Sequence, residues 1–292
     1  MKTKNGFTLL ESAKDVKNWL AKQHVSRTIT KLQVHHMDMP SYSTWEKTDK
    51  KVFSEPHFGR TQSLDDYGKR TWHSSDGHGH YIAQHFNVFP DGKITTGRNL
   101  NSTPIGIRGW NTNAICIEIY GCFDKGKDKM TSAQKKAVIY LYGELCKRFN
   151  IPVNTTHIRP HCWFTASGTY LGKYDSSRSA KTCPGTNFWG HGCSPDGFDH
   201  FIKDVKNYVN GKKEEEHKEE KPKEFKQYIA RCTTDDLNCR KGPGIKYDVV
   251  DVINKGVAIT IVEEKEVDGG TWCKGKAGYW VNKKYLEFVR YV

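Results

Sequence analysis

Residues 114–121 read AICIEIYG, an apolar run that contains a single acid, Glu118. A short apolar run of this length predicts a buried strand. A carboxylate in such a strand is unfavourable unless it is paired, bound to a metal or used in chemistry. Glu118 is therefore the most informative acid in the chain, and the alternative interpretation is a structural glutamate held in a salt bridge.

A second strand, which ends in two histidines, is predicted at residues 29–36, where the sequence ITKLQVHH alternates between polar and apolar residues. Neighbouring residues on a strand point to opposite faces, so only one of His35 and His36 can point into a given site. A short strand at residues 155–157 ends in His157, and His161 follows four residues later. Histidines at strand ends are candidate metal ligands, with solvated or capped histidines as the alternative.

The other elements of the first 210 residues alternate between helix and strand. Thr131 and Gln134 fit a helix cap, and the helix that follows carries an apolar stripe as far as Phe149. Residues 37–79 have no periodic pattern, so we expect a long irregular loop that covers or forms a cleft. Further helices are expected at residues 12–23 and 198–205, and a hairpin is expected from strands 81–88 and 93–95 around the turn at 90–92.

The sequence KTCPG at residues 181–185 combines a cation, a thiol and a rigid turn. Pro184 fixes its own φ angle, and Gly185 can adopt a backbone conformation closed to other residues. Lys181 places a positive charge where it can favour a thiolate at Cys183 or a developing oxyanion. The alternative is a structural turn with a buried free thiol.

Composition limits the class of protein. The net charge of +13 predicts attraction to polyanions such as nucleic acid, anionic membranes or an anionic cell wall. No apolar run approaches the roughly eighteen residues that a membrane-spanning helix needs, and no secretory signal is recognisable. The nine cysteines are odd in number and irregularly spaced, so we expect mostly reduced thiols, made in a cytoplasm, with at least one recruited to a metal.

Taken together, these residues resemble the zinc N-acetylmuramoyl-L-alanine amidases of the type 2, peptidoglycan-recognition-protein-like family, over roughly residues 25–205. The resemblance implies an α/β fold with a mixed central β-sheet flanked by helices. It also implies one Zn²⁺ bound by His35, His157 and Cys183, with a position left for water. His161 is a rival for the second histidine, because His157 precedes Cys183 by more residues than is usual in that family, and ligation by Asp175 is a weaker alternative.

The reaction implied is hydrolysis of the amide between the lactyl group of N-acetylmuramic acid and L-alanine of the stem peptide. Some family members use a tyrosine as general base, but Gln84 stands at the matching position here. The resemblance therefore favours Glu118 as base and Lys181 as the cation that stabilises the oxyanion. His36, Trp110 and Asn111 match positions expected to contact substrate.

The C-terminal region resembles a bacterial SH3 domain. The sequence LNCRKGPG at residues 237–244 is similar to a signature of that family, and short strands with tight turns predict a small all-β barrel. Such domains on wall hydrolases bind peptidoglycan, so Tyr247, Trp272 and Tyr279 are candidate cell-wall contacts, whereas Trp280 is interpreted as a core residue.

The sequence thus predicts a modular peptidoglycan hydrolase of the phage endolysin kind. Residues 1–210 form the zinc amidase domain, 211–226 a charged flexible linker, and 227–292 the SH3-like wall-binding domain. The expected partner is bacterial peptidoglycan, with neither nucleic acid nor stable membrane insertion, and the expected location is the host cytoplasm until lysis and then the cell wall. A non-catalytic peptidoglycan receptor and a zinc endopeptidase are the alternatives, and the oligomeric state is not predicted.

Overall fold

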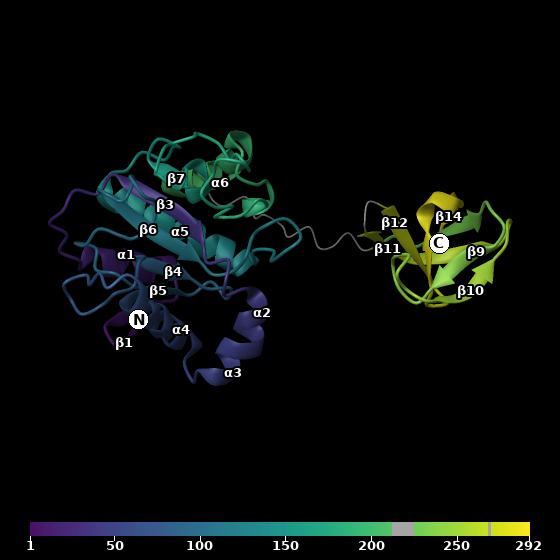
Figure 1. The fold of residues 1–292 in the computed structure, drawn as a ribbon, viewed down its shortest axis with the longest axis horizontal. Coiled ribbons are helices and arrows are strands. Elements are labelled where there is room, and N and C mark those ends of the chain that lie inside the picture. Colours follow the sequence, from purple (N-terminus) through teal and green to yellow (C-terminus); the bar gives the residue numbers. More distant parts are fainter. Residues whose placement is uncertain (212–224, 268–269) are drawn as a thin grey trace. The chain divides into compact units, whose positions relative to one another are not determined.

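The computed structural model describes residues 1–211, 225–267 and 270–292 (Figure 1). The chain divides into two compact units, Met1–Glu215 and Glu216–Val292. The linker predicted at 211–226 lies almost entirely outside the described residues. No helix in the described part of the chain combines the length and apolar content needed to cross a membrane.

The first unit is organised around two parallel strands, β3 (Lys31–His36) and β6 (Ala114–Ile119). They belong to a sheet with the order β1-β2-β5-β4-β6-β3-β7, of which β3, β4, β5 and β6 can be followed in Figure 1. Strands β4, β6, β3 and β7 are parallel, and β1, β2 and β5 are added antiparallel at one side. The remaining strands are β1 (Lys2–Lys4), β2 (Phe7–Leu10), β4 (Phe86–Val88), β5 (Ile94–Thr96) and β7 (Ile158–Pro160). The predicted mixed sheet is therefore confirmed.

Side-chain alternation gives the two faces of this sheet different chemistry. One face carries the apolar residues of β3, β4 and β6 and packs in one core with α1 (Ala13–Ala21), α5 (Ser132–Phe149) and α6 (Pro195–Val209). The opposite face carries Gln33, His35 and Glu118, and α4 (Pro56–Thr71) covers its far end through Thr61, whose hydroxyl lies 2.7 Å from that of Thr95. The polar face is thus left for a site.

The largest difference from the sequence prediction lies in residues 37–79. Instead of an irregular loop, this segment contains α2 (Tyr42–Thr44), a π-helical turn (Trp45–Asp49), α3 (Lys50–Val52) and the long α4. The buried positions of α4 are mostly polar or glycine, among them His57, Thr61 and Asp65, so the helix has no apolar stripe to reveal it. The β1–β2 hairpin, which turns at Asn5 and Gly6 with positive φ angles, is likewise not predicted.

Two local predictions are confirmed. The Oγ1 atom of Thr131 accepts the N–H of Gln134 at 3.0 Å and so caps α5. Strands β4 and β5 form the expected hairpin, in which Gly92 has φ +82° and its N–H donates to the Phe89 carbonyl at 3.0 Å. The strand before this turn is shorter than the predicted 81–88, because only Phe86–Val88 pairs in the sheet.

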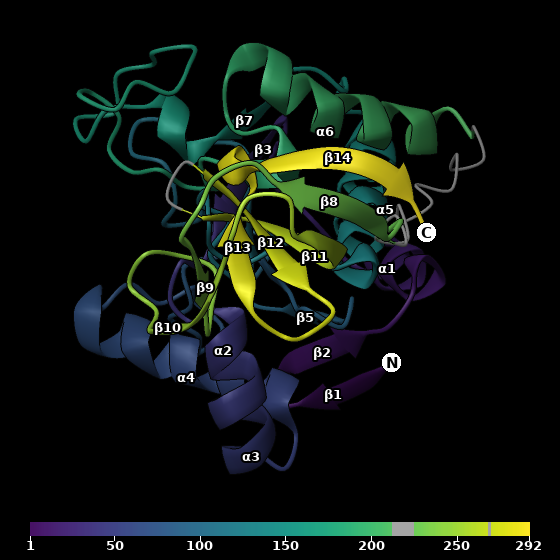
Figure 2. The ribbon, with the colours of Figure 1, turned by 90° about the vertical axis from the view of Figure 1, so that its right-hand side faces the viewer.

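The second unit is an antiparallel all-β sheet, compatible with the predicted SH3-like barrel. Its strand order is β10-β9-β13-β12-β11-β8-β14, and β14 runs beside β8 in Figure 2. The strands are β8 (Tyr228–Cys232), β9 (Leu237–Arg240), β10 (Val249–Ile253), β11 (Ala258–Val267), β12 (Gly270–Gly275), β13 (Trp280–Asn282) and β14 (Leu286–Tyr291).

The aromatic residues expected to contact the cell wall differ in exposure. Tyr247 is exposed, and its ring lies against Gly242. Tyr279 packs against the core of the second unit, and Trp272 is only 6% exposed. Trp280 is buried, as expected for a core residue. Of the three candidates, Tyr247 therefore presents the most surface to a ligand.

Candidate metal centre and active site

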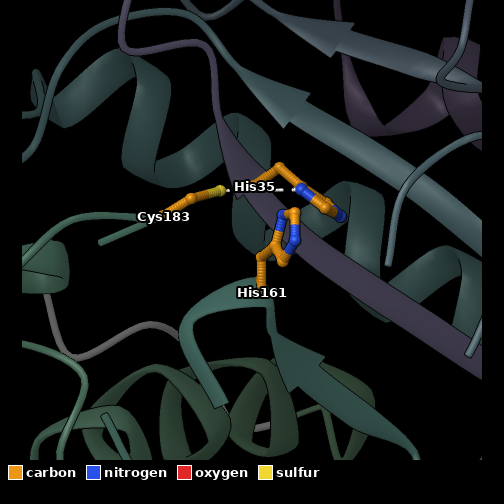
Figure 3. A group of neighbouring side chains, drawn as sticks. All are labelled: His35, His161 and Cys183. Carbon is orange, nitrogen blue, oxygen red and sulfur yellow. Dashed lines mark hydrogen bonds between the residues drawn. The ribbon is translucent and has the colours of Figure 1, made fainter. Parts of the chain in front are cut away.

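Three metal-ligating side chains converge at the carboxyl ends of β3 and β7 (Figure 3). His35 lies near the end of β3, His161 follows β7, and Cys183 comes from the later loop. Parallel strands end at the same edge of a sheet, which is why residues distant in sequence meet here. The Sγ atom of Cys183 is 3.5 Å from His35 Nδ1, and one donor atom from each of the three residues lies within 4.8 Å of the others.

The structure corrects the prediction that His157 is the second histidine ligand. His157 comes before β7, so it lies at the opposite end of that strand from the site. Its carbonyl accepts the N–H of Leu32 at 2.8 Å, and its Nδ1 is 2.9 Å from Asn154 Oδ1. His161, the rival in the sequence analysis, lies beside His35 with a ring-centroid distance of 4.9 Å. Asp175 bonds locally to Ser177 instead.

The turn that carries Cys183 is held by several contacts. The backbone N–H of His36 points at Cys183 Sγ from 3.4 Å, an arrangement that favours a thiolate. Gly185 has φ +123°, and a Cβ atom there would lie 2.3 Å from the carbonyl oxygen of Phe123, so only glycine fits. Asp124 accepts the N–H of Thr186 at 2.8 Å and the hydroxyl of Thr182 at 3.0 Å. The His36 N–H thus contacts the sulfur atom itself, and the contacts of Gly185 and Asp124 hold the turn that carries it.

Glu118 faces this group from β6, where the parallel register places it directly opposite His35. Its Oε1 is 3.8 Å from His35 Nδ1. Within the described residues, its Oε2 is buried and has no hydrogen-bond partner. Burial raises the pKa of Glu118 to about 8, and the charge of Lys181 opposes that shift. An unsatisfied buried carboxylate oxygen beside a nitrogen and sulfur cluster fits a site built for a cation and a water molecule.

The two histidines are suited to be neutral ligands. Burial lowers the pKa of His161 to about 4, with the charges of Lys181 and His36 as smaller contributions. Burial also lowers the pKa of His35 well below its ordinary value. A neutral imidazole offers a nitrogen lone pair, which is the form that binds metals. The charge of Lys181 acts in the same direction on both rings, so this cation lies near the cluster.

The residues expected to contact substrate are engaged inside the protein. The ring of His36 accepts the N–H of Phe123 at Nδ1, 3.1 Å away. Trp110 is buried, with its ring 5.7 Å from that of Phe164. Asn111 Oδ1 accepts from Gln33 and from the N–H of Gly106.

Gln33 is the neighbour of His35 that sequence reasoning missed. It is buried on the same face of β3, with Oε1 3.3 Å from His35 Nε2. Gln33 stands two residues before a candidate ligand on an alternating strand, so the two side chains share a face, and this spacing is a signal that could have found it.

A long segment, residues 162–182, separates His161 from Cys183, and hydrogen bonds join its two ends. The N–H of Cys162 donates to the carbonyl of Cys183 at 2.7 Å, and the N–H of Ala180 donates to that of Phe164 at 2.8 Å. The hydroxyl of Ser179 donates to the Cys162 carbonyl at 2.6 Å. The two candidate ligands, His161 and Cys183, are therefore neighbours where this segment begins and ends.

A family model described as N-acetylmuramoyl-L-alanine amidase matches residues 25–186, which is more than half of the chain. No curated protein matches. Among solved structures, the amidase LysC from Clostridium intestinale URNW is 20% identical, with a TM-score of 0.38 over 63% of this chain and 87% of that one. Drosophila PGRP-LB is 17% identical, with a TM-score of 0.37 over 58% and 85%. The Ph2119 endolysin of a Thermus scotoductus MAT2119 bacteriophage is 21% identical, with a TM-score of 0.33 over 60% and 91%.

Proposed function

Because the chain belongs to the N-acetylmuramoyl-L-alanine amidase family, we propose that its first unit hydrolyses the amide between N-acetylmuramic acid and L-alanine in peptidoglycan. The observation that carries this proposal is the convergence of His35, His161 and Cys183 beside the unsatisfied carboxylate of Glu118. A peptidoglycan hydrolase needs a water-activating centre, and these residues have the chemistry of one.

We propose Zn²⁺ as the cofactor, held by the two imidazoles and the thiolate. Two nitrogens and one sulfur are ligands that zinc prefers, and three protein ligands leave a coordination position open. When bound, zinc acts as a Lewis acid that acidifies water and polarises the scissile carbonyl. Burial raises the pKa of the Cys183 thiol in the protein alone, so metal binding has to release a proton there.

Glu118 is proposed as the general base. The backbone pairing of β3 and β6 brings it next to the candidate ligand cluster, and its Oε2, which has no hydrogen-bond partner among the residues that the structure describes, can accept a proton from the attacking water. The raised pKa of Glu118 lets the carboxyl group return that proton to the leaving amine of L-alanine. Lys181 is proposed to stabilise the negative charge that develops on the amide oxygen.

The second unit is proposed to bind the cell wall, as an SH3-like domain of a phage endolysin does. Its tether to the first unit would raise the local concentration of the amidase on an insoluble polymer. The net charge of +13 supports attraction to an anionic wall. The proposed location is the host cytoplasm until lysis and the cell wall afterwards.

The test is digestion of purified peptidoglycan by the full chain loaded with zinc, followed by analysis of the released ends. We expect new L-alanine amino termini without new reducing sugars. Amino termini of another stem or bridge residue would identify an endopeptidase instead. Binding to the polymer without release of any end would identify a receptor, and Glu118→Gln serves as the control for contaminating hydrolase.

A further inference from the structure

A buried glutamine lies directly behind the candidate ligand His35. Gln33 is 0% exposed and sits two residues earlier on β3, on the same face of the sheet. Its Oε1 is 3.3 Å from Nε2 of His35. The other ring nitrogen, Nδ1, faces Cys183 and Glu118. The two nitrogens of His35 therefore have different partners, and only one of them faces the ligand cluster.

The surrounding backbone determines which way the Gln33 amide points. Its Nε2 donates to the carbonyl of Trp110 at 3.1 Å and to Asn111 Oδ1 at 3.0 Å, which uses both amide hydrogens. Its Oε1 also accepts the N–H of Ile107 at 3.3 Å. If the amide were reversed, its NH₂ group would face the N–H of Ile107, which is also a donor. Its oxygen would face two acceptors, the Trp110 carbonyl and Asn111 Oδ1. Oε1 is therefore the atom that meets His35, and it can only accept.

Since the Oε1 atom of Gln33 can only accept, His35 carries its proton on Nε2 and keeps the lone pair on Nδ1. We propose that Gln33 is a positioning residue, which selects this tautomer and ring orientation and so presents His35 Nδ1 to the metal. This inference rests on the proposed zinc function. A ligating histidine is commonly oriented by an acceptor at its other nitrogen, and loss of that acceptor weakens metal binding about 10- to 100-fold.

The loop from Gly106 to Asn111 is built around the Gln33 amide. Asn111 Oδ1 accepts both from Gln33 and from the N–H of Gly106, the latter at 3.1 Å. A Cβ atom on Gly106 would lie only 1.9 Å from Gln33 Oε1, so the glycine makes room for the amide. Through its Oδ1, Asn111 therefore supports the amide that meets His35.

The test compares the full chain with Gln33→Met, which keeps the side-chain length and removes the acceptor. Zinc affinity is measured by competition with a chromophoric chelator, and the His35 tautomer is read from ¹⁵N NMR shifts of the metal-free protein. We expect zinc affinity to fall about 10- to 100-fold, and the Nε2–H tautomer to lose its dominance. Gln134→Met is the matched control, because Gln134 is a buried glutamine of the same unit whose amide donates to Val88 and Tyr120.

Asn111→Ala provides a second variant in case Gln33→Met does not fold. It removes one anchor of the Gln33 amide and should weaken zinc binding in the same direction, whereas a substrate contact would change KM and leave zinc affinity intact. Unchanged tautomer and zinc affinity in both variants would overturn the inference. If the unmodified chain binds no zinc, the proposed function fails, and the tautomer measurement still decides the role of Gln33.

Discussion

The stability of the first unit should fall in mild acid because of His85, which is buried beside the strand that carries Glu118. The Nδ1 atom of His85 accepts the N–H of Cys116 at 3.0 Å, and Nε2 donates to the carbonyl of Ser102 at 3.0 Å. The backbone N–H of His85 also donates to the Cys116 carbonyl at 2.9 Å. Protonation of Nδ1 would break the side-chain link to β6.

The magnitude follows from the pKa of His85. Burial, with a smaller contribution from the charge of Arg27, lowers this pKa from 6.5 to about 3. Between these values the unfolded chain binds a proton that the folded chain does not, so the free energy of unfolding decreases as the pH falls below 6.5. Each pH unit is equivalent to about 1.36 kcal/mol, which gives a loss of roughly 2.7 kcal/mol at pH 4.5 relative to neutral pH.

The assay is urea unfolding of the full chain and of His85→Gln at pH 7.5 and pH 4.5, followed by backbone NMR signals of β6 so that the first unit alone is observed. Other titrating groups affect both proteins, so the difference between the two pH dependences isolates His85. We expect the variant to be less sensitive to acid by about 2.7 kcal/mol. Parallel pH dependences, or a His85 ring that titrates near 6.5 in the folded protein, would refute the reasoning.

Three further outcomes are expected at the candidate site. After dialysis, metal analysis should find zinc in His157→Ala but little in His161→Ala; equal zinc in both would contradict the ligand assignment. Glu118→Gln should keep zinc while release of L-alanine termini falls about 10²- to 10⁴-fold, with the buried Glu144→Gln as control; retained activity would remove Glu118 as base. Lys181→Met should lower kcat by about 10²- to 10³-fold with little change in KM, and an effect on KM alone would indicate binding instead.

The parts of the site that lie on long strands could be predicted from sequence. The alternating run that forms β3 and the apolar run that forms β6 place His35 and Glu118 at recognisable positions, and the hydrogen-bonded register of the two strands brings their side chains together. The helix cap at Thr131 and the turn at Gly92 were predictable because each depends on local chemistry. The cap and the turn need only information carried by neighbouring residues.

The choice between His157 and His161 could not be made in this way. Strand β7 has only three residues, Ile158–Pro160, which is too short to show a period, so the pattern could not tell which histidine stands at which end. Helix α4 was missed for a related reason, since polar contacts such as that of Thr61 with Thr95 fix it to the sheet. The sequence also did not reveal that the side-chain oxygen of Asn111 accepts a hydrogen bond from the buried Gln33.

The hydrogen bonds that join the two ends of the segment between His161 and Cys183 have a consequence for protein engineering. Because Cys162 and Phe164 are tied to Cys183 and Ala180, the segment beyond them begins and ends at nearly the same point. Its length and sequence can therefore change without moving either candidate ligand, as loop-closure entropy depends only weakly on length. This segment is accordingly a graft site, at which the chain can be exchanged while His161 and Cys183 stay in place.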